Sequence, residues 1–290
     1  MRILINGGHG LLAHSLRELA TADLEVECLD LPDFDLTRPE TMIRHLDAVR
    51  PEVVINTAAY NLVDRCEQER DLSWAVNAEG PKTLAQLCGE RGCRMVHYSS
   101  DYVFDGAKAS PYTEADIPNP LNHYGAGKLA GEQAVLTAAP ANLVLRTSWL
   151  FGPHPTQTKT YLHTVMRLTA TGSALKATTD QVAVPTYSPD LASWTLELIR
   201  LKASGLFHAV NDDGVSRYDW TLAILADARQ LGLLSAPPSV EAVTTAYFTP
   251  TMRRPGYTVL GNSKLTDILG RPCGSWRPGV RKMLATGWPR

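Results

Sequence analysis

The chain lacks the features that mark disulfide-stabilised and zinc-binding proteins. Its five cysteines are an odd number and form no CxxC pair, so we interpret them as reduced thiols that mostly pack. Its eight histidines form neither an HExxH motif nor a Cys/His cluster. We therefore expect no structural or catalytic zinc, and we assign no metal ligands.

The chain also lacks strong charge of either sign and long apolar runs. Its formal net charge is −2 with no basic run, so we expect no nucleic-acid partner and no anionic membrane partner. No apolar run approaches a membrane span, and residues 2–6 enter an apolar strand with no room for a signal peptide. These absences predict a cytoplasmic protein without a membrane partner.

What the chain does have is an alternation of strand-like and helix-like patterns. Such alternation predicts an α/β fold of the Rossmann type, with a doubly wound parallel sheet covered by helices on both faces. The second half is less regular and predicts a smaller C-terminal lobe. The expected strands are residues 2–6, 24–30, 53–59, 94–100, 143–148 and 205–210, and the expected helices are residues 11–22, 39–49, 71–92, 121–138, 161–171, 189–202 and 218–231.

A glycine-rich turn follows the first strand, in the run Gly7-Gly8-His9-Gly10-Leu11-Leu12-Ala13. Gly7 allows a sharp turn, and Gly10 lets a pyrophosphate approach the backbone N–H groups at the helix N-terminus. Ala13 is small enough for close packing of helix and strand. The spacing is not GxGxxG, so an ordinary tight turn is the alternative. We favour a dinucleotide site, within a domain that spans residues 1–150.

Asp30 ends the second expected strand, twenty residues after Gly10. A carboxylate at that place can bond ribose hydroxyls, which favours NAD(H), whereas it would repel a 2′-phosphate. Arg38 lies downstream and would soften that repulsion. The alternative is a solvated loop acid.

Tyr124 and Lys128 are four residues apart, so on a helix they share one face. A cation within about 4–6 Å lowers the pKa of a phenol by roughly 1–3 units. We interpret the pair as a proton donor to a carbonyl during reduction. The alternative is an amphipathic helix with a surface lysine. Ser100, at the end of the fourth strand, would bond the same carbonyl, although a serine before Asp101 is also a common cap.

Three further strand ends and loops have two interpretations each. Small residues at 56–60 leave room for a ring or a ribose, or simply pack. Trp149 would either line one side of a substrate pocket or be a buried structural residue. Arg253 and Arg254, on a proline-punctuated loop, suit phosphate recognition or are solvated.

Taken together, these segments resemble the extended short-chain dehydrogenase/reductase superfamily and, within it, the dTDP-4-dehydrorhamnose reductase family. The resemblance covers essentially the whole chain, and its most specific motif is Ser99-Ser100-Asp101-Tyr102-Val103-Phe104-Asp105-Gly106. The other motifs that carry it are Gly7-x-x-Gly10-x-x-Ala13, Val63-Asp64-Arg65-Cys66-Glu67, Asn77, Tyr124-x-x-x-Lys128-x-x-Gly131-Glu132, Arg146-Thr147-Ser148-Trp149, Asp180-Gln181, residues 185–192, Arg254-Pro255 and Asn262-Ser263-Lys264-Leu265.

The resemblance implies NADPH- or NADH-dependent reduction of the C4 ketone of a dTDP-4-keto-6-deoxyhexose, such as dTDP-4-dehydro-L-rhamnose to dTDP-L-rhamnose, and a possible homodimer. Tyr124 would donate the proton, Lys128 would hold the nicotinamide ribose and lower the Tyr124 pKa, and Ser100 would bond the C4 oxygen. Residues 151–290 would form mainly the nucleotide-sugar lobe, with some segments returning to the sheet. The other implied site residues are Gly7, Gly10, Leu11, Leu12, Asp30, Asp35, Leu36, Ala58, Ala59 and Tyr60 around the cofactor, and Asp101, Tyr102, Trp149 and Arg254 around the substrate.

One segment departs from the family pattern. Residues 153–161 lack the glycine- and asparagine-rich residues that commonly follow the Phe151-Gly152 turn in relatives. That segment tends to approach the substrate, so the sugar and the configuration at C4 stay open.

Two other activities also stay open. One is a non-catalytic NADP-binding regulatory subunit, like that of methionine adenosyltransferase; retention of Ser100, Tyr124 and Lys128 argues against it. The other is a nucleotide-sugar epimerase or dehydratase. A dehydratase usually adds an acidic pair, and Asp101 supplies only one acid.

Overall fold

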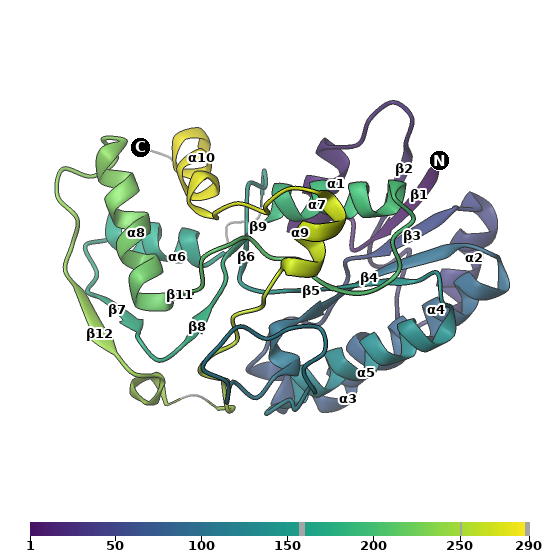
Figure 1. Cartoon of the computed structure of the whole chain (residues 1–290), viewed down its shortest axis with the longest axis horizontal. Coiled ribbons are helices and arrows are strands. Elements are labelled where there is room, and N and C mark those ends of the chain that lie inside the picture. The colour runs from purple at the N-terminus through teal and green to yellow at the C-terminus, as the bar shows by residue number, and fades with distance from the viewer. Residues whose placement is uncertain (157–159, 250, 288–290) are drawn as a thin grey trace.

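The computed structural model describes residues 1–156, 160–249 and 251–287. Its centre is a six-stranded sheet with the order β10-β5-β4-β3-β1-β2, and every neighbouring pair is parallel (Figure 1). The chain moves outward in both directions from β1 and β3, so the predicted doubly wound parallel sheet is confirmed. The strands are β1 (Arg2–Asn6), β2 (Glu25–Leu29), β3 (Val53–Asn56), β4 (Arg94–Ser100), β5 (Leu143–Thr147) and β10 (Gly205–His208).

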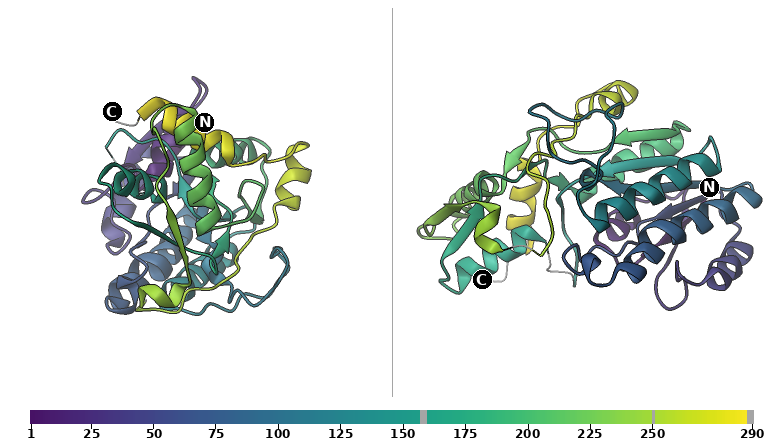
Figure 2. Two further views of the ribbon diagram at one scale, coloured as in Figure 1. Left: turned by 90° about the vertical axis from the view of Figure 1, so that its left-hand side faces the viewer. Right: turned by 90° about the horizontal axis from the view of Figure 1, so that it is seen from below.

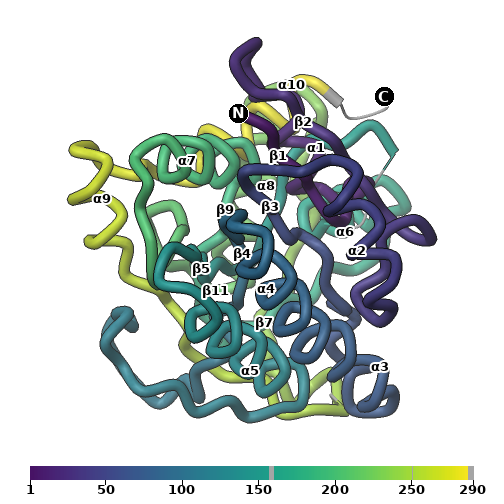
Figure 3. The backbone as a smooth tube through the Cα atoms, turned by 90° about the vertical axis from the view of Figure 1, so that its right-hand side faces the viewer, coloured from purple at the N-terminus to yellow at the C-terminus, as the bar shows by residue number. Residues whose placement is uncertain are grey.

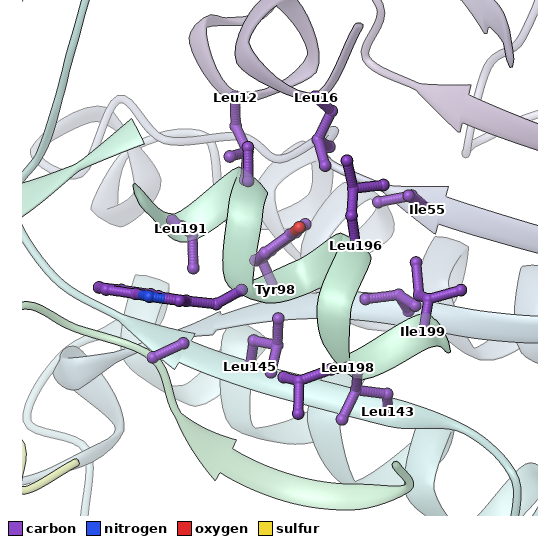
Figure 4. Close-up of a cluster of buried hydrophobic side chains, with 14 of the residues drawn as sticks. Leu12, Leu16, Ile55, Tyr98, Leu143, Leu145, Leu191, Leu196, Leu198 and Ile199 are labelled. Carbon is purple, nitrogen blue, oxygen red and sulfur yellow. The ribbon is translucent and has the colours of Figure 1, made fainter. Parts of the chain in front are cut away.

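Helices cover both faces of this sheet. Along β1, Ile3 and Ile5 pack into one core layer and Leu4 into the other, as strand alternation requires. Figure 4 shows the first layer, and Figure 3 shows α4 and α5 of the second side by side. The first layer is covered by α1 (Leu11–Glu18), α7 (Ser188–Arg200) and α9 (Ser263–Leu269), and the second by α2 (Pro39–Val49), α4 (Gly80–Glu90) and α5 (His123–Ala138).

The third strand is shorter than the predicted residues 53–59. It stops at Asn56, where its parallel pairing with β1 ends. The Thr57 N–H and hydroxyl both donate to the carbonyl oxygen of Asn6, at 3.0 and 2.7 Å. Residues 58–60 are thereby released as a loop at the carboxyl edge of the sheet.

The helix predicted over residues 71–92 is continuous from Arg70 to Glu90, but a π-helical turn divides it into three consecutive segments. These are α3 (Arg70–Trp74), a π-helical turn η2 (Ala75–Glu79) and α4. The π turn carries Asn77, whose side chain bonds both the N–H and the carbonyl oxygen of Tyr60 at 3.0 Å. Inserted turns of this kind are frequent at functional sites.

The second half of the chain builds a smaller lobe beside the sheet (Figure 2). Its core combines aliphatic residues with large aromatic ones, including the buried side chains of Phe151, Trp220 and Trp276. Two later segments return to the sheet, since α7 packs on it and β10 is its edge strand. The division at residue 150 stays a proposal. Within the described ranges, no helix is long and apolar enough to cross a membrane. The elements of the lobe are β6 (Leu150–Phe151), α6 (Tyr161–Ala170), β7 (Leu175–Thr178), β8 (Val182–Ala183), β9 (Thr186–Tyr187), β11 (Val215–Ser216), α8 (Arg217–Gln230), β12 (Val240–Val243) and α10 (Arg277–Gly287).

Candidate active site

The glycine-rich turn forms a cradle at the carboxyl edge of the sheet. Gly7 has a φ of +79°, and a Cβ there would lie 2.8 Å from both the Ala58 nitrogen and the Thr57 hydroxyl. Gly10 is the N-cap of α1 and supplies no capping side chain. The first N–H groups of α1 can therefore serve an anion. A side chain at Gly7 would collide with residues 57 and 58, so this tight turn requires glycine there. A glycine turn that leads into a helix N-terminus fits a dinucleotide.

Asp30 follows β2 and joins the cradle. Its Oδ2 accepts the His9 N–H at 2.8 Å, and its Oδ1 accepts the Leu31 N–H at 2.8 Å. The Gly8 N–H donates to the Leu29 carbonyl oxygen at 2.8 Å. The structure thus places Asp30 beside the turn, at the same sheet edge as Ala58.

The other residues predicted near the cofactor differ in whether their side chains or only their backbone groups can face a ligand. The Leu12 side chain points into the core (Figure 4), and the Leu36 side chain is buried in the opposite layer, so only their backbone groups can face a ligand. Leu11 is half-buried in the first turn of α1. Asp35 is half-exposed, and its Oδ1 accepts the Thr37 N–H at 2.8 Å.

The loop after β3 holds Ala59 and Tyr60, both partly exposed. The backbone of Tyr60 is fixed by Asn77, and its hydroxyl hydrogen-bonds Glu69. Tyr60 is therefore held from two sides at the entrance to the cradle.

The predicted catalytic side chains meet where β4 ends and α5 begins. Gly125 makes this approach possible, because a Cβ there would lie 2.1 Å from the Tyr102 carbonyl oxygen. The rings of Tyr102 and Tyr124 stand edge to face, with centroids 5.8 Å apart. The Ser100 hydroxyl lies close enough to the Tyr124 phenol to lower its pKa. The structure thus brings Ser100 and Tyr124 together, although they lie on different elements.

Ser100 is also bonded to a buried acid. Its hydroxyl donates to Asp101 Oδ1 at 3.0 Å and accepts the Tyr102 N–H at 3.2 Å. The other Asp101 oxygen accepts the Thr258 hydroxyl at 2.6 Å. Burial raises the pKa of Asp101 to about 6, against the lowering effect of the hydrogen bonds from Thr258 and Ser100. Asp101 therefore holds the Ser100 hydroxyl rather than standing free in the pocket.

The net shift of the Tyr124 pKa is upward, not downward as predicted, because burial dominates it. Burial raises the pKa of Tyr124 well above its usual value. The nearby Ser100 hydroxyl opposes this rise, and the Asp101 charge adds to it. Lys128 is 3% exposed, and burial lowers its own pKa to about 8, against the effect of Glu132. For both pKa values, the effect of burial is larger than the charge attraction expected from the helical spacing. Burial disfavours the charged form of both groups.

A cavity of about 530 Å³ lies where the small lobe meets the loop after β3. Arg254 stands at that junction, and its Nη2 donates to Asp64 Oδ2 at 2.7 Å. Lys176 and Arg217 also line the cavity, so three cations surround it. This charge suits a phosphate-bearing ligand. The neutral side chains of the lining include Tyr161, Thr178, Gln181, Thr245 and Phe248.

Arg217 is the residue that the sequence reasoning missed. Its guanidinium lies 3.5 Å from the ring centroid of Trp149 and 4.5 Å from that of Tyr161. It also interacts electrostatically with Tyr102 and Asp101, which lie beside Tyr124 and Ser100 and so connect the cavity to them. In the sequence, only its place at a helix start, between Ser216 and two aromatic residues, could have pointed to Arg217. That signal is weak. Trp149, which was predicted, has a strained φ of +40° that aims it at this guanidinium.

The described parts of the divergent segment 153–161 lie in two different places, one beside α1 and the other in the cavity lining. His154 contacts His14 of α1 with ring centroids 5.0 Å apart, whereas Tyr161 lines the cavity. Residues 157–159 lie outside the described residues. In the part of the chain that the structure describes, no three His, Cys, Asp or Glu side chains gather to hold a metal ion.

The chain is similar to known proteins over its whole length. Residues 1–287 match the family described as the RmlD substrate binding domain. A dTDP-4-dehydrorhamnose reductase from Aggregatibacter actinomycetemcomitans is 34% identical over 98% of both chains. A probable dTDP-4,6-dihydroxy-2-methyloxan-3-one 4-ketoreductase from Streptomyces antibioticus is 36% identical over 97% of this chain and 94% of that one. The crystal structure of a dTDP-4-dehydrorhamnose reductase from Bacillus anthracis in complex with NADP has a TM-score of 0.90 and 30% identity over 97% of both chains.

Proposed function

The chain belongs to the RmlD substrate binding domain family, and on this basis we propose that it is an NADPH- or NADH-dependent reductase of the C4 ketone of a dTDP-4-keto-6-deoxyhexose. The substrate we favour is dTDP-4-dehydro-L-rhamnose, with dTDP-L-rhamnose as the product. One observation carries the proposal. Ser100, Tyr124 and Asp101 connect the sheet edge that holds the glycine cradle to a cavity lined by Arg217 and Arg254.

Tyr124 is the proton donor in this reaction. Bound NADPH or NADH supplies a hydride to C4. Tyr124 gives its phenolic proton to the C4 oxygen, so that the carbonyl becomes a secondary alcohol. Since burial raises the Tyr124 pKa, the phenol keeps its proton at neutral pH until negative charge develops on that oxygen. The Lys128 ammonium, one helical turn away, then stabilises the tyrosinate electrostatically.

Ser100 orients the carbonyl. In the structure its proton points to Asp101, and turning the hydroxyl toward the C4 oxygen gives the ketone a second donor. Asp101 then keeps its bond from Thr258. Two donors aimed at the oxygen that gains charge lower the barrier more than they tighten ground-state binding.

The nucleotide part of the substrate belongs in the cation-lined cavity. Arg254 and Arg217 are the diphosphate ligands we propose, because a guanidinium can bind phosphate oxygens at two points. The carboxylate of Asp64 already holds Arg254 in place.

The decisive experiment measures cofactor oxidation with dTDP-4-keto-L-rhamnose and with its C5 epimer, using NADPH and NADH, and identifies the products by NMR. Stoichiometric oxidation with a new hydroxyl at C4 supports the proposal. Cofactor binding without oxidation of any dTDP-4-keto sugar would support the regulatory-subunit alternative. Turnover of sugar without net cofactor consumption would support an epimerase.

The homodimer and the cytoplasmic location stay predictions. Light scattering of the purified chain tests the first, and fractionation of the native cells tests the second.

A further inference from the structure

Two of the five cysteines meet at the C-terminal end of α4. The Cys93 N–H donates to the Cys88 carbonyl oxygen at 3.0 Å, and the Gly92 N–H donates to the Gly89 carbonyl oxygen at 3.2 Å. Gly92 has a left-handed φ of +65°. These bonds define a Schellman motif, in which the side chains at the two ends of the longer bond frequently make an apolar contact. In this protein the two side chains at that place are thiols.

The Cys88 and Cys93 thiols lie close enough to shift each other's pKa. The Cys88 thiol lowers the pKa of Cys93, against the effect of burial, whereas the Cys93 thiol and burial both raise the pKa of Cys88. The pair therefore releases its first proton from Cys93. The mechanism proposed above uses neither thiol.

Arg91 supplies a positive charge beside this pair. Its Nε donates to Asp47 Oδ1 of α2 at 2.8 Å and its Nη1 donates to the Leu87 carbonyl oxygen at 3.1 Å, so the guanidinium is held over the end of α4. The C-terminal end of a helix carries partial negative charge, which disfavours a thiolate, and the Arg91 charge offsets that effect. A thiolate beside a cation is the form of cysteine that reacts with oxidants.

Burial decides which of the two sulfurs an oxidant meets first. Cys88 is 0% exposed, whereas Cys93, next to the turn, is 7% exposed. The Cys93 thiolate attacks one oxygen of a peroxide, which breaks the O–O bond, forms a sulfenic acid and releases hydroxide. The Cys88 sulfur then attacks the sulfenic sulfur. Its thiol proton leaves with the hydroxyl group as water, and a disulfide remains.

We propose that Cys88 and Cys93 are a redox-modification site, at which hydrogen peroxide forms a reversible disulfide that fastens the end of α4 to the start of β4. The disulfide stabilises the fold under oxidising conditions and keeps Cys93 from irreversible oxidation. Cys93 directly precedes β4, and Ser100 is the last of the seven residues of that strand. Seven strand residues span about 23 Å. The disulfide therefore lies far from the catalytic side chains and leaves cofactor binding unchanged.

The first test treats the purified wild-type chain with hydrogen peroxide, blocks the remaining thiols with N-ethylmaleimide and digests the chain with trypsin. Trypsin cuts after Arg91, so Cys88 lies in the peptide 83–91 and Cys93 in the peptide 92–94. We expect mass spectrometry to find these two peptides joined, two hydrogen atoms lighter than their sum, and separate again after dithiothreitol. The proposal is overturned if Cys93 is found only as a blocked thiol or a sulfinic acid, or if either cysteine is joined to a different one.

The second test compares the melting temperatures of the oxidised and reduced forms of each variant, so that any loss of stability from the substitution itself cancels. Oxidation should raise the melting temperature of the wild type by roughly 3–8 °C. Cys93→Ser and Cys88→Ala should show no rise. Cys273→Ser is the matched control and should keep the rise, because Cys273 lies in the opposite core layer.

Three results of the second test would overturn the proposal. They are an unchanged melting temperature in the oxidised wild type, a rise that persists in Cys93→Ser, and a rise that Cys273→Ser abolishes. Fluorescence titration with NADPH completes the comparison. A loss of affinity on oxidation that the wild type shows and Cys93→Ser does not would contradict a disulfide that leaves the cofactor site unchanged.

Discussion

Glu132 and Arg146 form a two-point ion pair, with 2.8 Å between Arg146 Nε and Glu132 Oε2 and 2.5 Å between Nη2 and Oε1. The Arg146 side chain is 2% exposed and that of Glu132 is 3% exposed. Glu132 lies one helical turn after Lys128, and the Arg146 guanidinium also lies over the Phe104 ring at 5.0 Å. The pair ties α5, which carries Tyr124 and Lys128, to β5.

Replacing one partner of this ion pair should lower the free energy of unfolding more than replacing both partners. Glu132→Gln leaves a buried guanidinium without its counter-charge, and we expect a loss of about 3–5 kcal/mol of unfolding free energy. The double variant Glu132→Leu/Arg146→Met should recover much of that loss, because no charge is left buried. Denaturant unfolding of both single variants and the double variant measures the coupling. Additive losses in the double variant would contradict this account.

Lys128 should lower the free energy of unfolding at neutral pH. The folded state holds its proton less tightly than the unfolded state between the folded pKa of about 8 and the ordinary 10.5, so stability rises with pH across that window. Below the window the full penalty applies, which at one pKa unit per 1.36 kcal/mol is about 3 kcal/mol.

Lys128→Met should therefore be roughly 1–3 kcal/mol more stable than the wild type at about pH 7, and less so at about pH 10. Its reductase activity should be lost. Unfolding curves at both pH values test this, and a Met variant that is less stable at neutral pH would refute the electrostatic reading.

Asp101 should show the opposite pH dependence. Its folded pKa of about 6 lies above the ordinary 3.8, so the folded state binds the extra proton and stability falls as pH rises through this window. Asp101→Asn should gain roughly 1–3 kcal/mol at about pH 8 and nothing at about pH 3. Equal effects at both pH values would mean that packing, not ionisation, causes the change.

Tyr124→Phe should lower kcat by about 10²–10⁴-fold, because the variant has no proton to give. Dissociation constants for NADPH and NADH, measured by fluorescence, are the control and should stay within a few-fold of wild type, on the order of 1 kcal/mol. Near-normal turnover would remove Tyr124 from the role of proton donor.

Gly125→Ala should disrupt the meeting of α5 and β4. The new Cβ would lie 2.1 Å from the Tyr102 carbonyl oxygen, which is backbone and cannot move aside. We expect a loss of about 2–4 kcal/mol together with loss of activity. Gly89→Ala on α4 is the matched control, since nothing lies within 4 Å of its added Cβ, and it should gain about 0.5–1 kcal/mol. Melting temperatures and turnover of the two variants decide the matter.

Where the sequence carried local information, the predicted elements match the structure closely. The helix over residues 39–49 has its predicted ends, because Pro39 suits the first turn and the chain turns left-handed at Arg50, with φ +49°. The long helix predicted over residues 71–92 is present from Arg70 to Glu90, but the π-helical turn inside it was not predicted. Periodicity continues smoothly through a π turn, and the bonds from Asn77 to Tyr60 that accompany that turn come from a distant loop.

The sequence by itself determined the alternating pattern, the glycine cradle beside Asp30, and the presence of a serine, a tyrosine and a lysine at the right strand end and helix. These follow from spacing and side-chain size along neighbouring residues. Tertiary structure alone decided that Tyr124 has a raised pKa, that Arg217 joins the cavity to the catalytic side chains, and that His9 faces Asp30. The physical reason is that desolvation and charge contacts depend on which surfaces the fold buries together, and residues far apart in the chain make those surfaces.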